Sequence, residues 1–282
     1  MKRLVLATLL LTCVLVGARP ASAATITLYD SIPATLPGNL VSQPYQAQQT
    51  RQFGQAITLA GGGGVYDLTV TVLMSNWAYE STYQTVGTST GFNVPMTLNL
   101  FTDPGTGAAV SSAFATSTVS AAIPWRPEPG TGGCTGTTYR AADGQCYNGS
   151  LSTVTFNFGS VNLPANLIYG LAFNTQTWGY NPTGVPGPYN SLNFALASSN
   201  PSVGADTVPG TVYWDTLTAA WYTDLGVGGV GTFRRDTGWS PYTPAATFTA
   251  TVAPVPEPAS LVLLGSGLLG VVVMARRRKA KK

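Results

Sequence analysis

Two aspartates in the last third of the chain stand in a setting that could support glycoside hydrolysis. Asp215 and Asp224 flank Trp221 and Tyr222, and Trp214 lies directly before the first aspartate. A pair of carboxyl groups is the one hydrolytic apparatus that needs neither histidine nor lysine. A glycan hydrolase is therefore one hypothesis for this chain, although an aspartate in a β-protein is most often a turn or strand-end residue.

The rest of the composition argues against catalysis. The chain has no histidine, and residues 24–254 contain no lysine, which removes the usual general bases, metal ligands and Schiff-base amines. The run G-T-S-T-G at residues 87–91 has the letters of a nucleophile elbow, but such a serine needs a histidine base. We expect no catalytic residue, no metal and no cofactor. A structural calcium ion remains an alternative, although the sequence contains no calcium-loop motif that supports it.

The aromatic residues suggest a second kind of site. The chain has 6 tryptophans and 13 tyrosines, with local groups at Trp77/Tyr79/Tyr83, at Trp178/Tyr180 and at Tyr213/Trp214/Trp221/Tyr222. Trp214, Trp221 and Tyr222 of the last group are the candidate platform. Exposed aromatic rings could stack on sugars as a glycan platform, whereas buried rings would fill a β-sandwich core, their commoner fate. A carbohydrate-binding module is thus an alternative function.

Most of the positive charge lies at the two ends of the chain. Residues 24–254 hold five arginines and ten acidic residues, a formal net charge of −5. A nucleic-acid-binding protein needs a clustered basic face, so no nucleic-acid partner is expected.

The first 23 residues have the pattern of a cleaved secretory signal. Lys2 and Arg3 precede an apolar run from residue 4 to residue 16, and small residues at positions 21 and 23 suit signal peptidase. We predict cleavage between Ala23 and Ala24.

The last 28 residues read as a membrane-targeting segment. Pro256, Glu257 and Pro258 form a rigid entry that blocks a helix before residue 259. Residues 259–275 carry no charge and would span about 26 Å as a helix, a minimal transmembrane length. Residues 276–282 are rich in Arg and Lys, which keeps this end in the cytoplasm and places the main body outside.

This order of Pro-Glu-Pro, apolar helix and basic end resembles the PEP-CTERM sorting signal of Gram-negative bacteria that make extracellular polysaccharide. The resemblance implies that an exosortase recognises Pro256, Glu257 and Pro258, cuts the chain near this motif and passes it to a surface or matrix acceptor. Before that step the inner membrane would hold the chain.

The central residues 24–254 predict an antiparallel β-sandwich, jelly-roll-like, because short alternating runs are separated by Gly, Pro and Asn turns without a 3.6-residue period. Leu68, Val70 and Val72 alternate with polar residues, so their strand should have one buried face. The nine predicted strands are Thr25–Asp30, Gln52–Leu59, Tyr66–Ser75, Met96–Phe101, Val154–Phe158, Ile168–Asn174, Leu192–Ala197, Thr211–Asp215 and Ala246–Val252.

Two long segments between strands, residues 103–151 and 175–191, are predicted to be irregular loops. Cys134 and Cys146 are the only cysteines left after signal removal, so an exported chain should join them in a disulfide that clamps the first loop. Two free thiols or a metal pair are the alternatives, and two sulfurs without histidine make a poor zinc site.

Five runs in the body resemble a widespread group of secreted bacterial surface domains for which no activity is established: residues 53–62, 123–127, 143–149, 189–193 and 201–204. The sequence thus predicts three parts: a signal peptide (1–23), an extracytoplasmic body (24–254) and a sorting signal (255–282). The expected function is that of an exosortase substrate at the cell surface or in the extracellular matrix, with a structural or adhesive role. Exopolysaccharide is a candidate partner.

Overall fold

The computed structural model describes residues 24–105, 107–110, 112–217 and 231–252, together with residues 265, 267, 270, 276 and 277. The chain divides into two compact units, Met1–Thr25 with Thr251–Lys282, and Ile26–Ala250. The predicted signal peptide, Pro256, Glu257 and Pro258 lie outside the described residues, as does most of the predicted transmembrane helix. Among the described residues, no helix is both long and apolar enough to cross a membrane.

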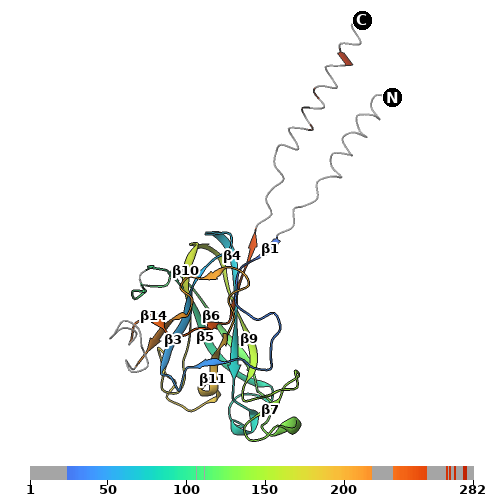
Figure 1. Cartoon of the computed structure of the whole chain (residues 1–282), viewed down its shortest axis with the longest axis vertical. Helices are drawn as coiled ribbons and strands as arrows, with labels where there is room; N and C mark the ends of the chain where they lie inside the picture. Colours follow the sequence, from blue (N-terminus) through green and yellow to red (C-terminus); the bar gives the residue numbers. More distant parts are fainter. Residues whose placement is uncertain are drawn as a thin grey trace. The chain divides into compact units, whose positions relative to one another are not determined.

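The body is built from antiparallel β-strands, as predicted (Figure 1). The first large sheet has the order β1 (Ala24–Asp30), β16 (Ala246–Val252), β4 (Gly64–Asn76), β11 (Leu192–Ala197) and β15 (Thr243–Pro244), with β9 (Ser150–Leu163) on β4 and β2 (Ser42–Pro44) on β11. The second has the order β14 (Arg234–Thr237), β13 (Thr211–Thr216), β3 (Thr50–Thr58), β10 (Asn166–Phe173), β5 (Gly91–Thr102) and β6 (Ala115–Pro124), with β12 (Ala205–Asp206) on β3. A small third sheet joins β7 (Tyr139–Arg140) to β8 (Cys146–Tyr147).

The two large sheets pack face to face around one main core. Phe53 of β3 meets Phe194 of β11 edge to face, with ring centroids 6.3 Å apart. In β4 the side chains of Leu68, Val70 and Val72 are fully buried, while the polar residues between them face outward. This alternation confirms the predicted half-buried strand and makes the body a β-sandwich.

The pairing of the eight strands of seven or more residues indicates the topology. Numbered along the chain, the first, eighth, third and sixth of these strands lie side by side in one sheet, and the second, seventh, fourth and fifth in the other. We interpret this order as a jelly roll, in which two Greek keys are wound into two sheets. The first and last strands of the body, β1 and β16, pair with each other in the first sheet.

All nine predicted strands are present, most of them longer than predicted, but the prediction that residues 103–151 form one irregular loop is wrong. This segment contains β6, which pairs with β5 from Gly91 opposite Pro124 to Leu100 opposite Ala115, as well as β7 and β8. The strand was missed because β6 alternates Ala, Thr and Ser, and only Ala121 and Ile123 of β6 are buried. Residues 175–191 do form a loop, ending in a short 3₁₀ turn at Pro188–Ser191.

The predicted disulfide is present. Cys134 and Cys146 are bonded, with their Cα atoms 5.8 Å apart, and the bond closes the segment that contains β7. Asp143, within this segment, accepts hydrogen bonds from the backbone N–H of Gly38 and from the hydroxyl of Tyr147, both at 2.8 Å. Backbone N–H groups of Gln145 and Gly38 lower the pKa of the Asp143 carboxyl. The covalent clamp and the carboxylate together hold this loop against residue 38.

Arg126 connects the same region to the end of β4. The side chain is 4% exposed, and its Nε donates to the backbone oxygen of Trp77 at 2.9 Å while Nη1 donates to that of Pro127 at 3.1 Å. The guanidinium also lies 4.6 Å from the ring centre of Tyr79. Burial lowers the pKa of Arg126, and the nearby Tyr79, Tyr139 and Glu128 oppose this shift.

Candidate functional site

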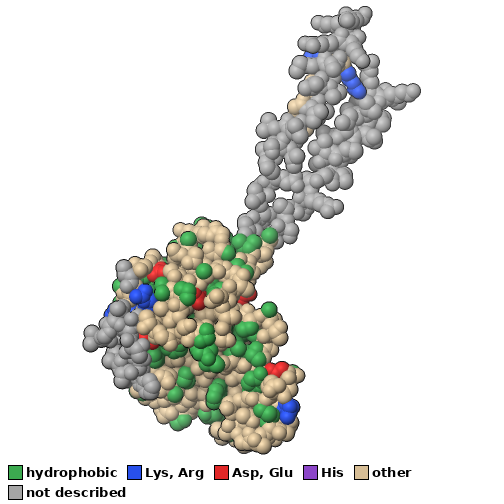
Figure 2. All heavy atoms as spheres, viewed as in Figure 1, with side chains coloured by type: hydrophobic (Ala, Val, Ile, Leu, Met, Phe, Trp, Pro, Cys, Tyr) green, Lys and Arg blue, Asp and Glu red, His purple; other side chains and the backbone are tan. Residues whose placement is uncertain are grey.

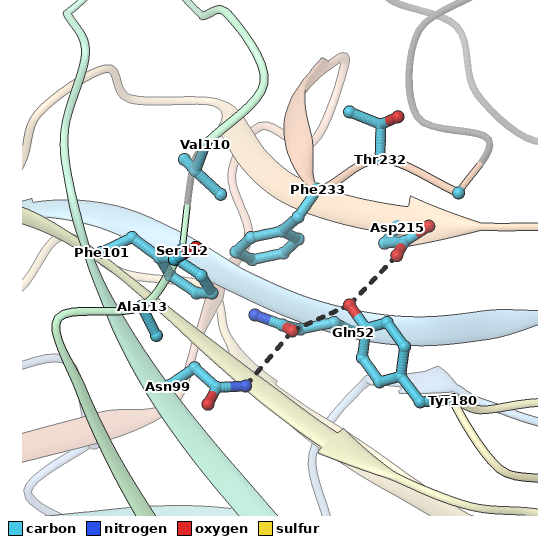
Figure 3. A pocket seen from close by; sticks show the side chains of 11 residues that line it. Gln52, Asn99, Phe101, Val110, Ser112, Ala113, Tyr180, Asp215, Thr232 and Phe233 are labelled. Atoms are coloured by element: carbon cyan, nitrogen blue, oxygen red, sulfur yellow. Dashed lines mark hydrogen bonds between the residues drawn. The ribbon is translucent and has the colours of Figure 1, made fainter.

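A pocket of about 380 Å³ lies on the outer face of the second sheet, and we call it the outer-face pocket (Figure 3). Its principal lining side chains are those of Gln52, Asn99, Phe101, Tyr180, Asp215 and Phe233. The alternation of β-strands explains this composition, because neighbouring residues point to opposite faces. Phe53 and Trp214 therefore enter the core between the sheets, while Gln52 and Asp215, the residues next to them, face the pocket.

A glycine makes room beneath the pocket. Gly170 of β10 pairs with Gly54 of β3 on one side and with Asn99 of β5 on the other. A Cβ atom at Gly170 would lie 2.0 Å from Nε2 of Gln52 and 2.7 Å from Cζ of Phe233. Any larger residue at this position would push these two side chains out of place.

The polar side chains of the pocket form one connected network. Nδ2 of Asn99 donates to Oε1 of Gln52 at 3.4 Å, and the hydroxyl of Tyr180 lies 3.0 Å from the same Oε1. That hydroxyl is also 3.1 Å from Oδ2 of Asp215. A tyrosine hydroxyl has one proton, so with Asp215 ionised it serves one of these two acceptors at a time.

Burial strongly affects the Asp215 carboxyl. The side chain is 2% exposed, and desolvation raises its pKa from 3.8 to about 6. Arg51, whose Nη1 lies 3.9 Å from Oδ2, opposes this shift, as does the Tyr180 hydroxyl. The backbone N–H groups of Thr232 and Gly231 also favour the ionised form, but none reaches hydrogen-bond geometry at Oδ1.

Arg51 covers the outer side of this network. Its guanidinium lies 4.6 Å from the ring centre of Tyr180 and close to Asp215, so it interacts with the ring and the carboxylate together. Burial, followed by the negative charge of Asp215, raises the pKa of the Tyr180 hydroxyl, which therefore stays protonated at neutral pH. Tyr180 acts as a hydrogen-bond donor in this site.

Two polar atoms of the pocket are buried without a hydrogen-bond partner in the part of the chain that the structure describes. They are Nε2 of Gln52, a donor, and Oδ1 of Asp215, an acceptor. In Figure 3 the amide nitrogen of Gln52 points away from Tyr180 and Asp215, toward Phe233. The pocket residues thus leave one donor and one acceptor open, and Nε of Arg51, beside them, is a further buried donor without a partner in the described part of the chain.

The predicted aromatic platform is wrong for Trp214. This residue is 3% exposed, packs edge to face on Trp239 with centroids 5.9 Å apart, and donates from Nε1 to Oγ1 of Thr50 at 3.0 Å. It is a core residue because its position on β13 points between the sheets. Trp221 and Tyr222, the other two residues of the predicted platform, lie outside the described residues.

The structure describes only one member of the predicted carboxylate pair. Asp215 lies in the pocket, whereas Asp224 falls outside the described residues, so the distance between the two is not defined. Within the described ranges, no group of three or more His, Cys, Asp or Glu side chains could hold a metal ion. Among the described residues, the exposed aromatic rings are those of Tyr180, which lines the pocket and is 50% exposed, Trp77 with 42% and Phe114 with 39%.

Sequence reasoning did not identify Gln52, Asn99 or Phe233 as site residues, and it named Tyr180 only as part of an aromatic group with Trp178. They come from two strands and two loops that are far apart in the sequence. The only available signal was the alternation in β3, which places Gln52 on the face opposite Phe53. Nothing in the sequence around Tyr180 indicates which strand it covers.

The decisive comparison concerns the C-terminal end. A family model described as the PEP-CTERM protein-sorting motif matches residues 254–279. The chain carries a PEP-CTERM sorting signal. The predicted recognition residues Pro256, Glu257 and Pro258 lie inside the matched range, and the predicted resemblance is confirmed. Comparisons with curated proteins and with solved structures gave no match.

The PEP-CTERM signal defines the route of this protein. It marks an exported chain that is anchored transiently in the membrane and then processed by an exosortase. The outer-face pocket belongs to the body and lies outside the matched residues 254–279, so its role must be argued from its own chemistry.

Proposed function

We propose that this protein is released from its membrane anchor by an exosortase and deposited at the cell surface or in the extracellular matrix, where its body has a structural or adhesive role in exopolysaccharide. The observation that carries the proposal is the sorting motif at residues 254–279, which follows directly on the last strand of an all-β body. The N-terminal segment, residues 1–23, serves as the cleaved signal peptide. Residues 259–275 hold the chain in the inner membrane before processing.

The properties of the body suit this destination. Its formal net charge is small for its size, and the face seen in Figure 2 carries few charged side chains among mixed polar and hydrophobic ones. The Cys134–Cys146 disulfide forms readily in the oxidising compartments that an exported protein enters. Strand β1 pairs with β16, so the body needs neither terminus to complete its sheets.

The outer-face pocket favours carbohydrate binding as a second candidate function. It brings hydrogen-bonding side chains and aromatic rings together on one sheet, which is what a sugar ligand requires. This version does not use the platform predicted from the sequence, since Trp214 is buried. We propose that the body is not an enzyme, because it lacks histidine and lysine and Asp215 hydrogen-bonds to Tyr180.

Substitution of the recognition motif tests the sorting proposal. We expect the double variant Glu257→Ala, Pro258→Ala to accumulate as unprocessed protein in the membrane, because the apolar anchor is intact while the exosortase signal is lost. The matched control is Lys281→Ala with Lys282→Ala, which lies beyond the matched residues and leaves residues 276–279 basic. Fractionation and immunoblotting measure the outcome. Normal maturation of the motif variant would refute exosortase sorting.

A further inference from the structure

The outer-face pocket contains an uncommon combination of buried polar atoms. Gln52 and Asp215 are each 2% exposed, and Nε2 of the first and Oδ1 of the second lack hydrogen-bond partners among the described residues. Buried polar groups are normally paired, because an unpaired one loses its hydration without compensation. Two such atoms lining one cavity indicate that a ligand supplies the missing partners.

The surrounding contacts hold these two atoms in fixed positions. Oε1 of Gln52 accepts a hydrogen bond from Nδ2 of Asn99, which orients the amide and leaves Nε2 pointing away from Asn99 and Tyr180. Oδ2 of Asp215 lies 3.9 Å from Nη1 of Arg51, and it shares the single proton of the Tyr180 hydroxyl with Oε1 of Gln52. The donor and the acceptor are therefore preorganised, and a ligand that fits them loses little free energy to rearrangement.

The two atoms without partners, Nε2 of Gln52 and Oδ1 of Asp215, favour a ligand with hydroxyl groups. The amide nitrogen needs an acceptor and the carboxylate oxygen needs a donor, and a hydroxyl group can serve as either. A molecule with several hydroxyls on a rigid ring satisfies both with neighbouring groups. The carboxylate of Asp215 opposes a negatively charged ligand, and the nearby guanidinium of Arg51 already interacts with Asp215 and Tyr180.

The apolar walls of the pocket fit the same ligand class. Phe101 and Phe233, whose ring centroids are 5.4 Å apart, line the cavity together with Val110. Such walls can contact the C–H faces of a sugar ring while the polar atoms bind its hydroxyls. The cavity of about 380 Å³ is at the lower end of the range of roughly 300–1,000 Å³ that small-molecule pockets occupy.

We propose that the outer-face pocket binds a neutral saccharide ring, with Gln52 donating to one hydroxyl and Asp215 accepting from another. The inference gives the adhesive role under Proposed function a ligand and rests on that proposal only for the source of the sugar. The site is separate in sequence from the sorting motif, so the two can fail independently.

The test is saturation-transfer NMR on the full chain purified in a zwitterionic detergent, since glucoside detergents would compete for the pocket. The probes are the methyl pyranosides of glucose, galactose, mannose and rhamnose, with methyl glucuronide as the anionic counterpart. We expect at least one neutral pyranoside to bind and to bind more tightly than the glucuronide. Binding of the glucuronide alone would overturn the proposal.

Three variants assign any binding to the pocket. Gln52→Glu keeps the acceptor that Asn99 and Tyr180 use but replaces the open donor, and it should weaken binding about tenfold or more. Asp215→Asn replaces the charged acceptor by the weaker amide oxygen, and it should weaken binding about fivefold. The control is Thr118→Ala, an exposed position on β6 of the same sheet, and it should bind like the parent. If Gln52→Glu does not fold, as judged by its thermal unfolding, Asp215→Asn decides.

Absence of binding by every neutral pyranoside, or binding that both pocket variants leave unchanged, would overturn the inference. Normal processing of the Asp215→Asn chain by the cell would at the same time show that the sorting proposal is unaffected.

Discussion

The hydroxyl of Tyr180 lies 3.1 Å from Oδ2 of the buried Asp215, and this contact couples the outer-face pocket to pH. With the carboxyl protonated, Asp215 can donate to Tyr180 while Tyr180 donates to Oε1 of Gln52, so that both short contacts are hydrogen bonds. With the carboxyl ionised, the single proton of Tyr180 serves only one of them. Protonation of Asp215 therefore supplies the donor that one of these two contacts lacks when the carboxyl is ionised.

We predict that Asp215 makes the body less stable as the pH rises from about 4 to about 7. The pKa of this carboxyl is about 6 in the folded state against 3.8 for an ordinary aspartate, so between these values the folded state binds more protons than the unfolded state. Its stabilising contribution is complete below about pH 4 and is lost as the pH rises through 6, and amounts to up to about 3 kcal/mol.

Urea unfolding of residues 24–254 at a series of pH values measures this effect, because that segment contains the whole core. Asp206, whose pKa burial also raises, contributes in the same direction, so the informative quantity is the difference between the parent and Asp215→Asn. The variant should lose part of the pH dependence. Identical pH profiles for the two proteins would mean that Asp215 has an ordinary pKa.

Loss of the Cys134–Cys146 disulfide should destabilise the body by about 3 kcal/mol, because the bond shortens the free loop of the unfolded chain. The comparison is the unfolding free energy of the parent against Cys134→Ser with Cys146→Ser. Thiol labelling of the denatured, unreduced parent is the direct check. Two reactive thiols in that sample would show that the exported protein carries no bond here.

Replacing Arg126 by lysine should destabilise the body by about 1–3 kcal/mol although the charge is kept. A lysine cannot donate to the backbone oxygens of Trp77 and Pro127 together while covering the ring of Tyr79. The control is Arg140→Lys in the disulfide loop, which should change stability less because the two backbone oxygens that Arg140 contacts, those of Gly132 and Gly144, belong to an exposed segment where water can replace the lost donors. If the two variants lose the same free energy of unfolding, the contacts of Arg126 do not contribute specifically to stability.

Much of the fold could be predicted from residue patterns. The alternation of Leu68, Val70 and Val72 with polar neighbours is a direct consequence of a sheet with one buried face, and the same reasoning found all nine predicted strands. It failed for β6, because Ala, Ser and Thr alternate there with almost no contrast in hydrophobicity. The disulfide was predictable because only two cysteines remain after signal removal.

The candidate site was much less predictable. Asp215 was singled out for its aromatic neighbours, but Trp214 beside it faces the core, and alternation with the apolar Val212 could have indicated this. Tyr180 reaches Asp215 across 35 positions of the chain and Gln52 across 128. Such contacts depend on how loops fold over the sheet, which local sequence patterns do not determine.

The central claim is that this chain is an exported protein processed at both ends, and intact-mass measurement of the protein recovered from outside the cell tests it most directly. We predict a species that begins at Ala24, ends close to the Pro256–Pro258 motif apart from any added acceptor, and lacks the apolar and basic residues that follow. A recovered chain that still ends at Lys282 would contradict exosortase processing.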